Sequence, residues 1–166
     1  GTLRESKTYI PGSVMVKHVT NDWQRGSGTF NRIITRLFGI TEETYELDGN
    51  LATRTTTNTG YDDYGFPTST TVLQLDGRKK TTAVTYGHDI TNWILGLKVL
   101  EQVTAEAPGF TPETRTTDYG YYTGLGLLAW ERTEPTDSAY TLTKSYSYGV
   151  LGNRTMTTVS GTGIVA

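Results

Sequence analysis

The chain has 166 residues, a formal net charge of -2 and no cysteine. Its near-neutral charge favours neither nucleic acid nor a strongly basic partner, and the lack of cysteine excludes disulfides and thiolate metal sites. This length fits one domain or a section of a larger one.

The composition favours sheet over helix. Threonine is abundant and the chain has 11 tyrosines, and both residue types suit a half-exposed sheet surface. The longest apolar stretch, Trp93–Leu97, ends at Lys98, whereas a membrane helix needs about 20 apolar residues. We therefore expect no membrane span. Because the chain begins with Gly1 rather than methionine, we expect it to be a piece of a longer polypeptide.

Residues 1–42 have the least regular pattern, and we treat them as an unassigned lead-in of strand and loop. The segment Asp22–Gly28 is typical of a loop, and Phe30–Phe38 fits either a strand or a short helix. Residues 43–166 form the second predicted region, a repetitive β-sheet segment.

Short β-prone runs alternate with turn signals throughout this second region. The Asp48-Gly49 and Asp76-Gly77 pairs predict tight hairpins in which both central residues have positive φ. Asp89–Trp93 fits a short helical turn. The predicted strands are 43–45, 51–55, 68–75, 78–86, 97–104, 114–119, 127–133, 140–148 and 154–160. The expected fold is all-β, built of repeated antiparallel hairpins.

One phrase, a tyrosine followed four residues later by a glycine, recurs along the chain. Recurrence of a short unit indicates a repeat architecture in which each unit packs on its neighbours. The glycine suits a turn with positive φ, and aspartates such as Asp48 and Asp62 can cap the turn. Tyr119 to Gly124 is a looser copy with one extra residue. The predicted repeat-turn residues are Tyr45, Gly49, Tyr61, Asp62, Gly65, Tyr119, Gly124, Tyr148 and Gly152.

These phrases resemble the repeats of RHS/YD-repeat proteins, which run roughly Tyr-Asp-x-x-Gly-Asn-x-Thr. The best matches are Tyr61–Thr68 and Tyr148–Thr155, and Asn92–Gly96 is similar to a further segment of that family. The aspartate after tyrosine is present only at Asp62, because Glu46, Gly120 and Gly149 replace it in the other copies. The resemblance covers about residues 43 to 160.

The resemblance implies a long twisted, spiralling sheet that forms part of a hollow β-shell. In bacterial RHS effectors and insecticidal toxin complexes the shell encloses a toxin polypeptide, and in teneurin-like proteins it supports adhesion. The self-cleaving end of the bacterial shell has no match here, so the segment resembles mid-shell. The implied partners are neighbouring repeats and an enclosed toxin, and the implied location is secreted or on the bacterial cell surface.

Residues that could carry chemistry are few. The two histidines are His18 and His88, and His88 would face away from the adjacent Asp89 in a strand. Asp62 and Asp63 lack ligands at calcium-site spacing. We therefore expect no enzyme activity, cofactor or metal.

Two alternatives to a shell segment remain. In the first, aromatic residues on the sheet face bind carbohydrate by stacking on sugar rings. The candidates are Tyr61, Tyr64, Tyr119, Tyr121, Tyr122 and Trp130, with Tyr121, Tyr122 and Trp130 as the main set. In the second, identical subunits pair through exposed sheet edges into an extracellular polymer.

Overall fold

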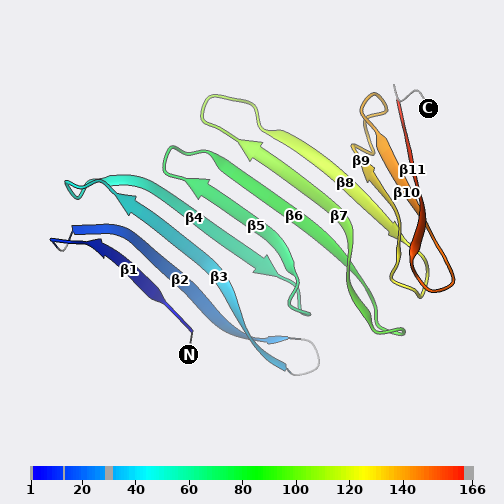
Figure 1. The fold of residues 1–166 in the computed structure, drawn as a ribbon, viewed down its shortest axis with the longest axis horizontal. Helices are drawn as coiled ribbons and strands as arrows, with labels where there is room; N and C mark the ends of the chain where they lie inside the picture. Colours follow the sequence, from blue (N-terminus) through cyan, green and yellow to red (C-terminus); the bar gives the residue numbers. More distant parts are fainter. Residues whose placement is uncertain (1, 13, 29–31, 163–166) are drawn as a thin grey trace. The chain divides into compact units, whose positions relative to one another are not determined.

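The computed structural model describes residues 2–12, 14–28 and 32–162, and these residues form strands and turns without a helix. Eleven antiparallel strands make one open sheet whose hydrogen-bonded order is the sequence order (Figure 1). The strands are β1 (Glu5–Ile10), β2 (Val14–Gly28), β3 (Arg32–Tyr45), β4 (Leu51–Tyr61), β5 (Pro67–Gln74), β6 (Lys79–Asp89), β7 (Ile94–Glu106), β8 (Glu113–Tyr121), β9 (Leu128–Thr133), β10 (Leu142–Tyr148) and β11 (Arg154–Gly161). The predicted all-β fold of repeated antiparallel hairpins is confirmed. No helix in the described ranges is long and apolar enough to cross a bilayer.

The chain divides into two compact units, and unit 1 comprises Gly1–Thr82 and Thr104–Glu113. Its longest pairing joins β2 to β3, from Lys17 opposite Thr44 to Gly28 opposite Arg32, with a register shift between Asp22 and Trp23. The prediction of a loop at residues 22–28 is therefore wrong. The turn-type residues of this segment are held in a strand because β3 supplies backbone partners along its whole length. For the predicted strand or helix at 30–38, residues 32–38 belong to β3, and residues 30 and 31 lie outside the described residues.

The hairpin turns at Asp48-Gly49 and Asp76-Gly77 differ from the two-residue type that the sequence suggests. Only the glycines have positive φ, at 87° for Gly49 and 84° for Gly77. The N–H of Gly77 donates to the carbonyl of Gln74 at 3.0 Å, and the N–H of Gln74 donates to the carbonyl of Arg78 at 2.9 Å. This geometry is a three-residue connection with a glycine bulge. Because aspartate then keeps an ordinary backbone conformation, only one residue per turn must be glycine.

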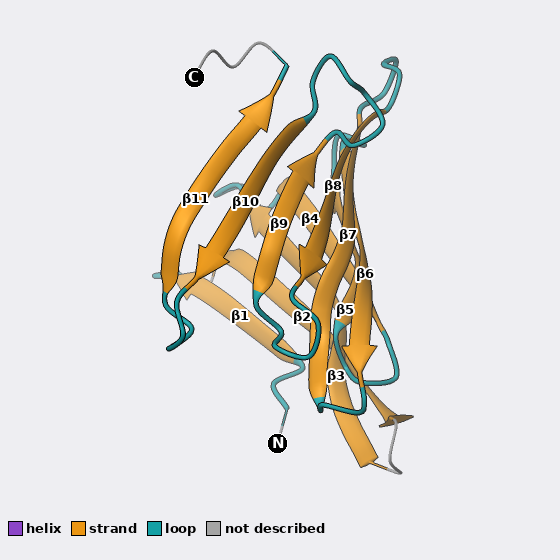
Figure 2. Cartoon of the chain, turned by 90° about the vertical axis from the view of Figure 1, so that its right-hand side faces the viewer, coloured by secondary structure: helices purple, strands orange, loops and turns teal. Residues whose placement is uncertain are grey.

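Unit 2 comprises Ala83–Val103 and Thr114–Ala166, and Figure 2 shows its strands β8 to β11 from the front. Strand β9 pairs with β8 and β10, and β11 pairs with β10 from Leu142 opposite Gly161 to Tyr148 opposite Arg154. Residues 90–93 form a turn closed by a hydrogen bond from the Trp93 N–H to the Ile90 carbonyl.

Burial is shallow in both units. Among the described hydrophobic residues only Tyr146 is buried, with 8% of its surface exposed. Within each unit, the described residues form no second layer of structure on which these strands could pack (Figure 1). Stability must therefore come from backbone pairing and cross-strand side-chain contacts rather than from a closed core.

Candidate functional site

The turns after three of the predicted tyrosines share one hydrogen-bond pattern. The glycine N–H donates to the carbonyl of the residue that follows the tyrosine. The N–H of that same residue donates to the carbonyl of the residue that follows the glycine. The turns are Glu46–Asn50 (3.0 and 2.8 Å), Asp62–Phe66 (3.1 and 3.0 Å) and Gly149–Asn153 (2.9 and 2.9 Å). The Asp62 carboxylate also accepts from the N–H groups of Tyr64 and Phe66, at 2.9 and 2.8 Å. The phrase is thus a hairpin turn with a tyrosine at its entrance.

Three tyrosines at strand ends donate their hydroxyls to a backbone carbonyl of the preceding strand. We call these contacts tyrosine clamps. Tyr61 on β4 bonds the Leu37 carbonyl at 2.8 Å, Tyr121 on β8 bonds Lys98 at 3.0 Å, and Tyr148 on β10 bonds Leu128 at 2.9 Å. Each clamp ties two strands near the turn. Tyr45, in contrast, donates to the Glu43 carboxylate at 2.8 Å.

The structure places Tyr121, rather than Tyr119, at the clamp position of β8. Tyr121 comes immediately before the 122–127 turn, and the register shifts between Gly120 and Tyr121 just as it does between Gly60 and Tyr61. Gly124 still has positive φ, 71°. A small residue before the clamp tyrosine is the signal that could have identified it in the sequence.

Tyr119 instead belongs to a network of tyrosine, glutamate and lysine. Its hydroxyl donates to Glu101 at 3.0 Å, and Lys98 pairs with the same carboxylate at 3.1 Å. Burial, and then this hydrogen bond to Glu101, raise the pKa of Tyr119 well above its ordinary value. The Tyr119 hydroxyl therefore stays protonated at neutral pH and acts as a donor.

A similar network surrounds Tyr146 on β10. The pKa of Tyr146 is raised by burial and by its hydrogen bond to Glu131. Lys144 pairs with Glu131 at 2.9 Å, and this hydrogen bond is the main cause of the lowered pKa of Glu131. Both networks join neighbouring strands.

A polar network in unit 1 is centred on Glu43. Its carboxylate receives Arg54 at 2.7 Å, Tyr45 at 2.8 Å and His18 at 3.2 Å. The hydrogen bond from Tyr45, and then that from Arg54, lower the pKa of Glu43. The other ring nitrogen of His18 lies 2.9 Å from Glu5. Residues from β1, β2, β3 and β4 are thus tied together, a role for His18 that the sequence did not suggest.

The three main carbohydrate candidates do not form one platform. Trp130 lies opposite Gly120 in the β8–β9 pair, so it shares the face of Gly120, and the adjacent Tyr121 faces the other side. Arg132 lies over the Trp130 ring at 5.3 Å. Tyr122 is 41% exposed and donates its hydroxyl to the Tyr146 carbonyl at 2.8 Å.

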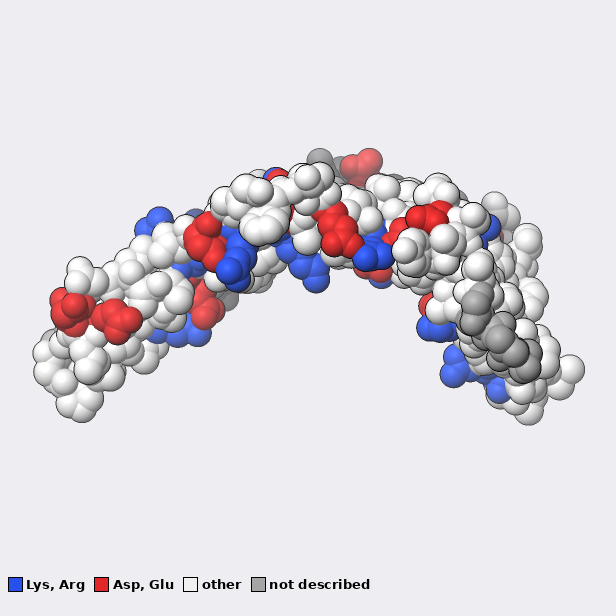
Figure 3. All heavy atoms as spheres, turned by 90° about the horizontal axis from the view of Figure 1, so that it is seen from above, with Lys and Arg blue, Asp and Glu red and all other residues white. Residues whose placement is uncertain are grey.

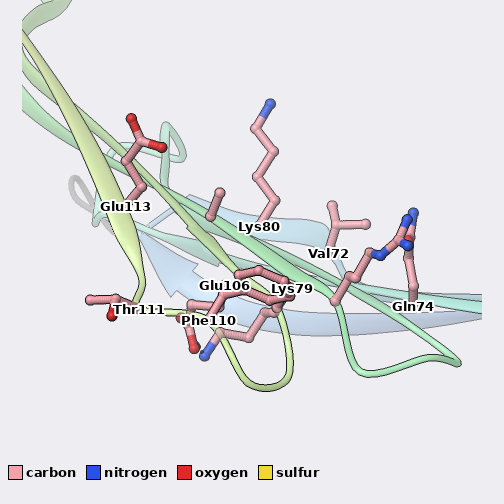
Figure 4. Close-up of a pocket in the computed structure, with 11 residues that line it drawn as sticks. Val72, Gln74, Lys79, Lys80, Glu106, Phe110, Thr111 and Glu113 are labelled. Atoms are coloured by element: carbon pink, nitrogen blue, oxygen red, sulfur yellow. Dashed lines mark ion pairs between the residues drawn. The ribbon is translucent and has the colours of Figure 1, made fainter.

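A hollow of about 630 Å³ lies within unit 1, between strands β5 and β6 and the loop after β7 (Figure 4). The ion pair between Lys79 and Glu106, at 2.8 Å, lines it, and Lys80 points away from this pair. Phe110 on its border is 77% exposed. The hollow is wide open, and its charged side chains of both signs give it no clear preference for one ligand.

The remaining candidates for chemistry are used in turns. His88 accepts the Gly96 N–H at 3.1 Å, and Asp89 accepts from Asn92. Within 2–12, 14–28 and 32–162, no group of three or more His, Asp or Glu side chains could hold a metal ion. Figure 3 shows basic and acidic side chains interspersed over the face in view.

Comparison with models of protein families finds no match to this chain, and comparison with curated proteins finds none either.

Proposed function

We propose that this chain is a non-catalytic wall segment of an RHS-type β-shell, secreted or at the surface of a bacterium, that encloses a toxin polypeptide. The observation that carries the proposal is the repeated tyrosine clamp. Tyr61, Tyr121 and Tyr148 each tie the end of one strand to the strand before it. Their hydroxyls are used to hold the sheet together.

A wall works by exclusion, and the organisation of the strands suits that role. A continuous backbone ladder separates two sides without any covalent chemistry. The shallow burial of the side chains supports the same proposal. A wall exposes both faces of its sheet, and other segments of the polypeptide would then cover them. Edge strands β1 and β11 each pair with one neighbouring strand, so further repeats could extend the sheet there.

The test is protease protection in the complete polypeptide to which these repeats belong. We expect a segment outside the repeats to resist trypsin until the wall is denatured. Tyr148→Ala removes a clamp and should lower the protease concentration at which that segment is cleaved. Tyr140→Ala is the matched control, since Tyr140 is 69% exposed and lies outside the clamps. A complete polypeptide in which every segment is cleaved alike would refute the proposal.

Edge pairing between identical subunits is the second candidate, and strand β11 favours it. All residues of β11 except Gly161 are exposed, including Met156 at 57% and Val159 at 45%. An exposed strand of this kind is a template for another strand. Light scattering on the 166-residue chain should then show a mass that rises with concentration. A monomer at every concentration would exclude this candidate and leave the wall proposal intact.

A further inference from the structure

Three hairpin turns of unit 2 carry exposed apolar side chains at their tips. They belong to the β6–β7, β8–β9 and β10–β11 connections. We call this set the apolar rim, and its members are Ile90 (46% exposed), Trp93 (55%), Leu125 (65%), Val150 (103%) and Leu151 (89%). Exposed apolar side chains that gather in one patch often mark a contact surface.

The three turns adjoin one another. A Cβ atom on Gly124 would lie 3.6 Å from the side-chain amide of Asn92, so the first two turns are neighbours. Tyr122 at the start of the second turn lies edge-on to Tyr148, with ring centroids 5.9 Å apart, next to the third turn. Figure 2 shows the β8–β9 and β10–β11 turns at the same end of these strands. The three turns therefore lie next to one another, and the apolar tips that they carry are neighbours.

The apolar rim is uncharged. Residues 90–93, 122–127 and 149–153 include no Asp, Glu, Lys or Arg. The acidic residue next to these turns in the sequence is Asp89. Hydrogen bonds from Asn92 lower the pKa of Asp89, so its charge is paired with a residue of the same turn. The loop at 134–141 in the same unit is different, because it contains Glu134 and Asp137.

The backbone of the apolar rim also makes hydrogen bonds within each turn. One N–H group at the tip of each turn donates to a carbonyl of the same turn: Trp93 to Ile90, Leu125 to Tyr122 and Gly152 to Gly149. Such internal pairing lowers the cost of placing a turn in a medium that cannot hydrogen-bond.

Trp93 is held at the rim at the expense of backbone strain. Its φ is 56°, and it donates its N–H across the turn as Gly49, Gly65 and Gly152 do in theirs, where φ is 87°, 98° and 76°. Glycine would be the unstrained choice at this position. A bulky residue kept in such a conformation indicates a use for its side chain.

We propose that the apolar rim inserts into the interfacial region of a zwitterionic lipid bilayer, independently of the wall role. Separate convex tips fit fluid acyl chains, whereas a rigid protein partner would need one pocket for each tip. Tryptophan with aliphatic residues suits the boundary between headgroups and acyl chains. The absence of lysine and arginine from the turns points to neutral rather than anionic lipid.

The test is flotation of the 166-residue chain with phosphatidylcholine vesicles. We expect binding that is unchanged between about 50 mM and 500 mM salt, because no ion pairs with lipid are involved. Brominated lipid should quench the fluorescence of Trp93, and Trp93→Phe should remove that quenching. The double variant Val150→Asp with Leu151→Asp should weaken binding by about tenfold or more, since two aliphatic side chains leave the bilayer.

The matched control is Leu47→Asp, which places the same charge at a 73% exposed turn tip in unit 1. It should leave vesicle binding unchanged, and circular dichroism should show the same sheet content in all variants. Three results would overturn the proposal: no vesicle binding, equal loss in the control, or a rim variant that changes only the oligomeric mass. The last result would assign the apolar rim to contacts between copies of the chain.

Discussion

One carbon atom added at Gly120 should have a large effect on stability. Gly120 lies directly opposite Trp130 in the β8–β9 pair, and a Cβ atom there would lie 2.2 Å from Cε2 and 2.3 Å from Nε1 of the indole. Carbon atoms in contact are normally about 3.5 to 4.0 Å apart. In Gly120→Ala the ring must therefore leave its place on the strand and its contact with Arg132.

The size of this effect follows from comparison with Gly60, which holds the same place before a clamp tyrosine. There the nearest atom to an added Cβ is the Ser69 hydroxyl oxygen at 3.1 Å, which can rotate away. Gly60→Ala should stabilise the fold by about 0.5 kcal/mol through reduced freedom of the unfolded chain. Gly120→Ala should instead cost about 2 kcal/mol, as overpacking does.

Urea unfolding followed by circular dichroism measures both values, and the melting temperature of Gly120→Ala should fall by about 4 to 8 °C. The cost should disappear when Gly120→Ala is made in a Trp130→Leu background, since the ring that it displaces is then absent. Equal unfolding free energies for Gly120→Ala and Gly60→Ala would refute the reasoning. So would a cost that persists without the indole.

Three other changes test the polar contacts. Tyr148→Phe removes the hydrogen bond to the Leu128 carbonyl and should lower the unfolding free energy by about 1 kcal/mol, measured in urea. Arg36 lies over the Tyr61 ring, and its Nε and Nη2 find no hydrogen-bond acceptor among the described residues. Arg36→Met should therefore leave stability unchanged or raise it by up to about 1 kcal/mol, and a clear loss would contradict this. The pKa of Glu43 is lower in the folded chain than in the unfolded chain. The charged Glu43 carboxylate therefore stabilises the fold above its unfolded pKa, and this stabilisation is lost as the pH falls through its folded pKa. The stability gap between the parent chain and Glu43→Gln should thus be widest near neutral pH and should close in acid, which unfolding curves at several pH values will show.

Local geometry explains which parts of the fold could be predicted. The glycines Gly49, Gly65 and Gly152 all have positive φ, as the tyrosine–glycine phrase requires. That preference acts over about four or five neighbouring residues, so it can be recognised in the sequence without knowing which strands pair. The strand runs between turns were predictable for the same reason.

The segment 22–28 shows the limit of local reasoning. Its glycine, aspartate and glutamine content favours a loop, yet β3 pairs with it throughout. Sheet propensity depends strongly on neighbours, so a partner strand can override it. The choice of Tyr121 rather than Tyr119 as the clamp likewise depends on the register shift after Gly120.

The sequence by itself determined an all-β chain of hairpins, because periodic β-prone runs and turn glycines act over a few residues. Only the tertiary structure decided which side chains meet. His18 reaches Glu43 across 25 positions, and Tyr148 reaches Leu128 across 20. The apolar rim joins tips from three separate turns. Such contacts follow from strand register, and a shift of one residue would turn every side chain of a strand to the other face.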